Sequence, residues 1–237
     1  MISDSTIKLN NEIFKCVNFV EIKNKWSEID SEYKCCNNKC INTNKPIGNC
    51  IIGNGFVNII DDENINYINC LEWGHNKYVV VLAENSFKKQ QNCFNYSLYY
   101  FEIKCKFEVD LNDYKWMSIG LNNCTNNYIE FSASFATVHN EKNEGFELGN
   151  ISWNNNDIFG CGLVYPPTNV TDAFPYVFFT HNGKQIGKAC LLKERNISYK
   201  PFVELKICSI EANFGDDLET KPFTYDISKH FILKEFY

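Results

Sequence analysis

The chain has 237 residues, a formal net charge of −6 and an aromatic content of 15%, most of it Phe and Tyr. Nucleic-acid-binding proteins concentrate Lys and Arg on one face, and this acidic chain does not, so nucleic acid is excluded as the expected partner. No run approaches the roughly 18 apolar residues that span a bilayer, so no membrane association is expected.

The N-terminus, residues 1–6, lacks the basic and apolar regions of a signal peptide. We therefore expect a cytoplasmic or nuclear protein, with secretion only if a leader is missing from this sequence. In a reducing compartment the 12 cysteines are expected to remain mostly thiols.

In chain order, residues 1–30 show a weak helical period through Ile13, Val17, Val20 and Trp26. A Cys-rich stretch over 35–50 follows, and Asn, Pro and Gly make it loop-like. From residue 55 onward, short β-prone runs alternate with turn residues. The strands predicted are Phe56–Ile60, Ile65–Leu71, Tyr78–Ala83, Tyr99–Glu108, Lys115–Leu121, Asp157–Tyr165, Tyr176–Thr180, Gln185–Leu191, Phe202–Ile207 and Ile210–Phe214.

The clearest strand is Tyr99–Glu108, because apolar residues occupy every odd position from Tyr99 to Phe107. The alternate face is expected to be solvated, and its members are Tyr100, Glu102, Lys104, Lys106 and Glu108. A type I′ turn is predicted at Asn182-Gly183, between two strands.

Together these elements predict an all-β sandwich of two antiparallel sheets with a short irregular Cys-rich N-terminal extension. The expected division is an extension over 1–54, the sandwich over 55–232 and a C-terminal tail over 233–237.

Three blocks of sequence follow one another in a fixed order. They are Tyr99–Ile103 with Ser118–Leu121, then Asn156–Leu163 with Val177–Gly187, then Tyr199–Leu205 with Glu211–Gly215 and Pro222–Asp226. Together they resemble the SPRY (B30.2/SPRY) domain, most closely the type in Ran-binding protein M, over about 78–231 with a motif core of about 99–228. The Cys-rich stretch and Ala83–Phe87 are also similar to the expanded SPRY-protein group of plant-parasitic nematodes.

The resemblance implies a concanavalin-like sandwich that binds another protein or a short peptide. Large aromatic residues of the motif are expected to fill the space between the sheets, namely Phe178, Phe179, Phe202, Phe214 and Phe223. The glycines of Phe159–Gly162 are expected to let backbones approach closely or a strand bend.

In SPRY domains, loops at one end of the sandwich form a shallow binding site. By position, the corresponding segments here are Glu84–Ser97, Asn123–Phe131 and Lys206–Ser209, with the enlarged loop Tyr165–Pro175 as a further source of specificity. The candidate partner-binding residues are Asn85, Ser86, Lys88, Lys89, Gln91, Tyr128, Lys206 and Cys208. Our hypothesis is that the three segments jointly bind an acidic or Asn-rich peptide.

The expected function is therefore a non-enzymatic scaffold or adaptor, or a parasite effector, with no cofactor. None of the four histidines has an obvious nucleophile or orienting carboxylate beside it. Lectin-like carbohydrate binding is one alternative. A zinc-stabilised scaffold is another, through Cys35, Cys36, Cys40 and Cys50, but these cysteines lack a C-x₂-C pair and a nearby His, so a free-thiol loop is the preferred interpretation.

Overall fold

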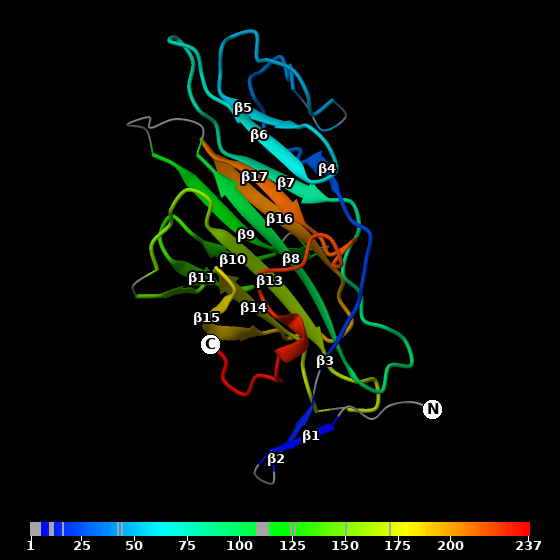
Figure 1. Cartoon of the computed structure of the whole chain (residues 1–237). Coiled ribbons are helices and arrows are strands. Elements are labelled where there is room, and N and C mark those ends of the chain that lie inside the picture. The colour runs from blue at the N-terminus through cyan, green and yellow to red at the C-terminus, as the bar shows by residue number, and fades with distance from the viewer. Residues whose placement is uncertain are drawn as a thin grey trace.

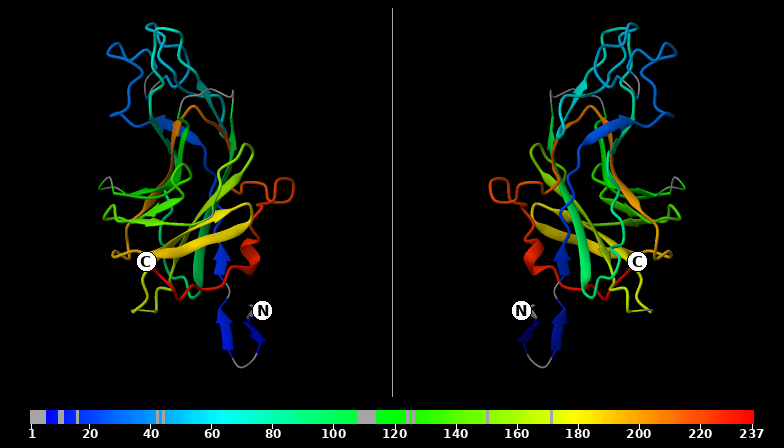
Figure 2. Two further views of the ribbon diagram at one scale, coloured as in Figure 1. Left: turned by 90° about the vertical axis from the view of Figure 1, so that its left-hand side faces the viewer. Right: turned by 90° about the vertical axis from the view of Figure 1, so that its right-hand side faces the viewer.

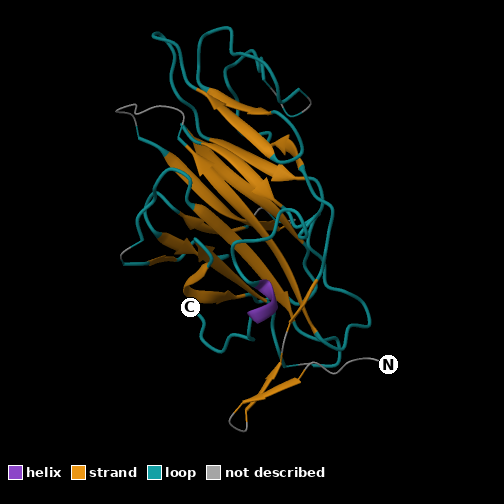
Figure 3. Cartoon of the chain, in the orientation of Figure 1, coloured by secondary structure: helices purple, strands orange, loops and turns teal. Residues whose placement is uncertain are grey.

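The computed structural model describes residues 6–9, 12–15, 17–41, 43, 45–107, 114–123, 125, 127–149, 151–170 and 172–237. Strands form nearly all of the regular structure in these ranges, and the one helical element there is a 3₁₀ turn at Ile227–Lys229 (Figure 3). The strands are β1 (Thr6–Leu9), β2 (Glu12–Lys15), β3 (Val17–Phe19), β4 (Trp26–Ile29), β5 (Phe56–Ile59), β6 (Asn64–Ile68), β7 (Val79–Ala83), β8 (Tyr96–Lys106), β9 (Trp116–Asn123), β10 (Tyr128–Ser132), β11 (Thr137–His139), β12 (Gly145–Glu147), β13 (Ile158–Tyr165), β14 (Tyr176–His181), β15 (Lys184–Leu191), β16 (Tyr199–Lys206) and β17 (Ser209–Asn213).

Two large sheets lie face to face (Figure 1). The seven-stranded sheet has the order β12-β11-β10-β9-β16-β7-β4, and all of its pairs are antiparallel. The eight-stranded sheet has the order β15-β14-β13-β8-β17-β6-β5, and β3 pairs with β8 in parallel. The predicted all-β sandwich of two antiparallel sheets is thereby confirmed.

The main core lies between the sheets and follows from the period-2 alternation of each strand. In β8 the odd-numbered residues Tyr99, Phe101, Ile103 and Cys105 are completely buried, as the sequence predicts. They belong to one apolar cluster with residues of the opposite sheet, such as Leu121 of β9. Asn182 and Gly183 have φ values of 47° and 77°, which confirms that both central turn residues have left-handed geometry.

The other face of β8 is buried at Tyr100 and Glu102, which corrects the prediction of a solvated side there. Lys104 and Lys106 remain partly exposed, and Glu108 lies outside the described residues. Tyr100 is 1% exposed and Glu102 is 4% exposed. The chain from Pro222 to Tyr237 runs along the outer side of the eight-stranded sheet and covers both residues (Figure 2, red). This covering segment and the sheet enclose a second apolar cluster, so the molecule has three layers at this point.

The same alternation decides where the motif phenylalanines lie. Phe178 and Phe179 are adjacent in β14, so their side chains point to opposite faces. Phe179 and Phe214 belong to the core between the sheets, as predicted. Phe178 and Phe223 instead belong to the outer cluster under the covering segment. The prediction that all five rings lie between the sheets is therefore wrong.

Residues 17–29 are part of the sandwich, although the sequence suggests a helical period there and an extension up to residue 54. Strand β3 pairs with β8, and β4 forms the edge of the seven-stranded sheet beside β7. Trp26 of β4 is 2% exposed and its ring packs edge-on against Phe101 and Phe214. An edge strand of four residues is too short to display a clear period of two, and this explains the mistaken helical pattern.

Candidate partner-binding groove

The predicted loop segments do not all lie at one end of the sandwich. Phe87 forms a bridge with Tyr199, and Tyr199 pairs with Asn123, so Glu84–Ser97 and Asn123–Phe131 meet at the start of β16. The Lys206–Ser209 turn follows the other end of the same strand. Eight strand residues separate the two ends by about 23 Å at 3.3 Å per residue. A joint site made of all three segments is therefore not formed.

Cys208 is completely buried, and its thiol donates to the backbone carbonyl of Ser209 at 3.4 Å. This burial withdraws the Cys208 side chain from any partner-binding surface. Lys206 lies next to it at the end of β16, with its ammonium group 5.2 Å from the ring centre of Tyr78.

The candidates in the first loop are on or near the surface, but they line no described groove. Lys88 and Gln91 are exposed, and Ser86 and Lys89 are half-buried. Asn85 is held to the N-terminal segment, because its backbone N–H donates to the Asn24 side chain at 2.9 Å. These residues remain predictions.

Tyr128 is the one predicted partner-binding residue that lines a groove in the described part of the chain. The groove has a volume of about 340 Å³ and lies on the outer face of the seven-stranded sheet. Its lining residues are Tyr33, Val80, Asn127, Tyr128, Glu130, Glu141, Asn143, Phe202 and Glu204. Strands β7, β10 and β16 form its floor, and the segments around Tyr33 and Glu141 form its walls.

Pairing across the sheet explains why these side chains meet. Gly120 of β9 pairs with Glu130 of β10 on one side and with Phe202 of β16 on the other. A Cβ atom on Gly120 would lie 2.0 Å from the carbonyl oxygen of Ile129 and 2.9 Å from Cε1 of Phe202, so the glycine makes room for the backbone of β10 and for the ring. The Ser-Ile-Gly-Leu motif thus contributes to the floor of the groove as well as to the fold.

Aromatic rings form the apolar part of the groove. The ring of Tyr128 packs edge-on against Phe202, with 4.8 Å between the ring centres. The Tyr128 hydroxyl donates to Asp30 Oδ2 at 3.1 Å, which fixes the orientation of the ring. Burial and the nearby Asp30 carboxylate raise the pKa of Tyr128 well above its ordinary value, so the hydroxyl keeps its proton.

Carboxylates form the polar part of the groove. Burial raises the pKa of Glu130 to about 7, and the negative charge of Glu204 adds to this effect. Burial raises the pKa of Glu204 too. The Glu204 carboxylate accepts hydrogen bonds from Trp116 Nε1 at 2.7 Å and from the Tyr33 hydroxyl at 3.5 Å. Neither of these two donors carries a charge.

The only cationic candidate beside Glu130 within the described ranges is His139, whose Nδ1 is 3.6 Å from Glu130 Oε1. Burial lowers the pKa of His139, so this ring is neutral at pH 7. The groove therefore combines aromatic walls with two partly buried carboxylates that no Lys or Arg neutralises in the described part of the chain.

The sequence pointed to Tyr128 and to the segment Asn123–Phe131, which contains Glu130, but it missed Tyr33, Phe202 and Glu204 as groove residues. Phe202 and Glu204 alternate with Val203 and Leu205 in β16, and this period of two marks them as facing away from the core. This alternation could have identified Phe202 and Glu204 from the sequence. Tyr33 gave no such signal, because it follows an edge strand that was not predicted.

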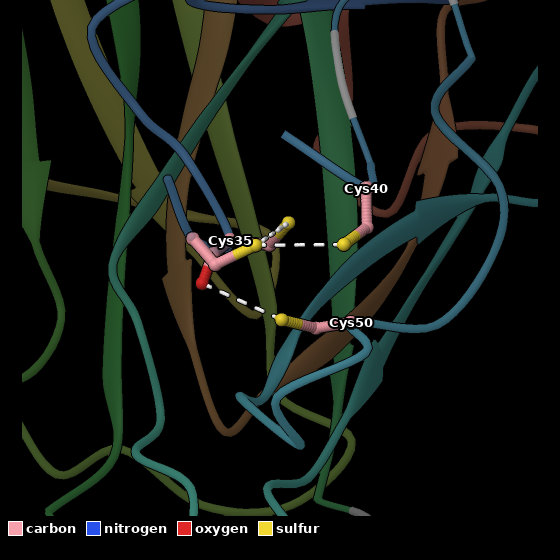
Figure 4. Close-up of side chains that lie close together, drawn as sticks. Cys35, Cys40 and Cys50 are labelled. Atoms are coloured by element: carbon pink, nitrogen blue, oxygen red, sulfur yellow. Dashed lines mark hydrogen bonds between the residues drawn. The ribbon is translucent and has the colours of Figure 1, made fainter. Parts of the chain in front are cut away.

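The four cysteines of the Cys-rich stretch come together, and Figure 4 shows the side chains of Cys35, Cys40 and Cys50 pointing toward one another. Their four sulfur atoms all lie within 4.8 Å of one another, although no C-x₂-C pair is present. Elsewhere Cys105 and Cys161 are buried in the core. In the part of the chain that the structure describes, no helix has the length and apolar character needed to cross a bilayer.

No family model matches the chain, and no curated protein matches it. Among solved structures, a human SPRY domain is 17% identical and has a TM-score of 0.49, covering 68% of this chain and 97% of its own. The SPRY domain of human HERC1 is 12% identical with a TM-score of 0.42, covering 65% and 90% respectively. Lectin II from Ulex europaeus is 9% identical with a TM-score of 0.36, covering 68% and 92%. Likeness at this level carries no information about a shared ligand.

Proposed function

We propose that this chain is a SPRY-type protein-interaction module of the Ran-binding protein M type, without enzymatic activity. The ordered motif blocks support this assignment. The positions of the motif residues in the fold also support this assignment. Gly160, Gly162 and Phe178 contribute to the outer cluster, and Asn213–Gly215 ends strand β17. The proposed role is that of a scaffold or adaptor, with a host-directed nematode effector as the second possibility.

The binding surface that we propose is the groove around Tyr128. The observation that carries this proposal is the pair Glu130 and Glu204, which are partly buried beside aromatic rings without a Lys or Arg partner in the described ranges. Burying carboxylates without a counter-charge is unfavourable, and an incoming cation would relieve that penalty. Open grooves with rigid aromatic walls are a frequent setting for interaction hot spots.

These charges also indicate the chemistry of the occupant. A Lys or Arg side chain of a peptide or protein loop would contact the carboxylates with its charged group and the rings of Tyr33 and Tyr128 with its stem. This replaces our hypothesis of an acidic peptide, because the groove itself is acidic and Lys88 and Lys89 do not line it.

Selection of a random peptide library on the immobilised full chain tests this proposal. We expect the selected peptides to contain Lys or Arg, and E130Q to weaken their binding by about tenfold through loss of one charge-assisted contact. Y128A is expected to weaken the binding of the same peptides. E147Q is the matched control, since this carboxylate is exposed on the same sheet and does not line the groove.

Two results would contradict the proposal. Selected peptides that bind equally well to the wild type, E130Q and Y128A would remove the groove as the site. Acidic peptides that lose binding only in the K88A/K89A double variant would return the site to the Glu84–Ser97 loop.

A further inference from the structure

The Cys-rich segment joins strand β4, which ends at Ile29, to strand β5, which starts at Phe56. Its described residues form turns and bends but no strand or helix. Few apolar side chains anchor it, and Ile41, which is 2% exposed, is the main one. A segment of this length with so little regular structure needs another source of stability.

Four cysteines converge inside this segment. The sulfur of Cys36 lies 3.8 Å from that of Cys35 and 3.4 Å from that of Cys40. With Cys50 included, every pair of the four sulfurs is within 4.8 Å. Cys35 and Cys50 are buried, and Cys36 and Cys40 are half-buried, so the cluster is closed on its inner side.

This arrangement has the dimensions of a tetrahedral thiolate site. Four sulfurs at about 2.3 Å from one zinc ion are about 3.8 Å apart along each edge of the tetrahedron. Two disulfides would require only that the sulfurs approach in pairs, whereas a metal ion requires all four to share one centre. The mutual proximity of the whole set is the feature that favours a metal.

Backbone groups around the cluster are suited to thiolates. The N–H of Ile41 donates to Sγ of Cys35 at 3.3 Å, and the N–H of Ile51 donates to Sγ of Cys40 at 3.5 Å. Such outer contacts orient metal-bound sulfur and disperse its negative charge. The Asn54 side chain also donates to the carbonyl of Cys35 at 2.6 Å, which ties the first cysteine to the start of β5.

We propose that Cys35, Cys36, Cys40 and Cys50 bind one zinc ion in a closed, structural Cys₄ site. Four protein ligands leave no open position for water or substrate, so the ion stabilises the segment and takes no part in chemistry. The spacing C-C-x₃-C-x₉-C differs from paired knuckles, but tertiary packing brings the last cysteine back to the first three. The site would also fix the segment that carries Tyr33, two residues before Cys35.

Metal analysis of the purified full chain, prepared under reducing conditions, tests this proposal. We expect about one zinc ion per chain in the wild type and less than about 0.1 in C40S and C50S. C70S is the matched control, because Cys70 is half-buried like Cys40 and lies outside the four-sulfur cluster. The C70S protein should therefore retain its zinc.

A second measurement covers the case in which the serine variants do not fold. Wild-type protein treated with a strong chelator is expected to lose several degrees in Tm and to regain them on addition of Zn²⁺. Replacement by Co²⁺ should produce the intense visible absorption of a tetrahedral thiolate complex.

Three outcomes would overturn the proposal. One is wild-type protein that contains no stoichiometric zinc and does not bind Co²⁺. Another is a set of alkylation and mass-spectrometry data that show two disulfides among the four cysteines in protein kept under reducing conditions. The last is equal zinc content in C40S, C50S and the wild type.

Discussion

The carboxylate of Glu102 accepts a hydrogen bond of 2.9 Å from the backbone N–H of Tyr225. The neighbouring N–H of Thr224 donates to the same carboxylate at 2.8 Å, and the Tyr100 hydroxyl donates at 2.9 Å. A charged side chain on the outer face of β8 therefore holds the covering segment against the sheet.

Replacing Glu102 by Gln should loosen the covering segment. The amide nitrogen of Gln cannot accept a hydrogen bond, so one backbone N–H loses its partner in a partly buried position. The expected loss is about 2 kcal/mol in the free energy of unfolding. Hydrogen exchange at Thr224 and Tyr225 should accelerate, while E235Q, on an exposed side chain, should change neither quantity. Unchanged exchange at both amides would show that Glu102 does not anchor the segment.

Replacing Gly162 by Ala should destabilise the sandwich through the outer cluster. A Cβ atom at this position would lie 2.2 Å from Cε1 of Phe178, whose ring is completely buried. Overpacking of this kind costs about 1–3 kcal/mol, measurable by urea unfolding. Gly149 is the control, because nothing lies within 4 Å of a Cβ there. Equal stability of G162A and G149A would show that the Phe178 ring can move aside.

Replacing Glu130 by Gln should stabilise the protein at high pH. The pKa of this carboxyl is raised from 4.5 to about 7 in the folded chain, chiefly by burial. Between pH 4.5 and 7 the unfolded state loses its proton more readily, so this group lowers the free energy of unfolding as pH rises. The free energy of unfolding of E130Q should therefore exceed that of the wild type by about 2 kcal/mol at pH 8 and match it near pH 4.5. A constant difference across this range would exclude the raised pKa.

Replacing His230 by Gln should make the stability of the fold less sensitive to acid pH. Burial lowers the pKa of His230 from 6.5 to about 4. Its Nδ1 and Nε2 contact the hydroxyls of Tyr225 and Tyr176 at 2.8 and 3.1 Å, and its ring stacks on Phe178. The unfolded state therefore takes up a proton first as pH falls from 6.5 to 4, and the folded state is destabilised over that window.

We expect the wild type to lose about 2 kcal/mol through this group between pH 7 and pH 4.5, and H230Q to lose much less, as measured by urea unfolding. H230Q should be less stable than the wild type at pH 7, because the ring contacts are lost. H75Q, at an exposed histidine, should follow the wild-type pH profile. Parallel profiles of H230Q and the wild type would rule out this role for His230.

Most strands of the sandwich could be predicted because their signals are local. Alternating apolar residues define β8, and an Asn-Gly turn joins β14 to β15. Strands β10 to β12 were missed because they are short and contain polar residues such as Glu130 and His139. Strands β3 and β4 were missed for a similar reason, since a few residues at a sheet edge do not establish a period.

The candidate site was predictable only in part. Tyr128 was identified from its place in a loop, but the carboxylates that give the groove its character come from different strands. Glu130 and Glu204 are 74 positions apart in the chain and approach only because β10 and β16 flank β9. No spacing rule in the sequence expresses such a relationship.

From the sequence alone, the all-β class, the main strands and the buried odd-numbered face of β8 could be established, because alternation and turn chemistry act over a few residues. Which outward-facing residues become buried depends instead on how distant segments pack in the folded chain. Tyr100 and Glu102 have the pattern of a solvated face, and they are covered because a segment about 120 residues later packs on them. Burial by a distant segment is a property of the packed chain and leaves no periodic signal in the residues that it covers.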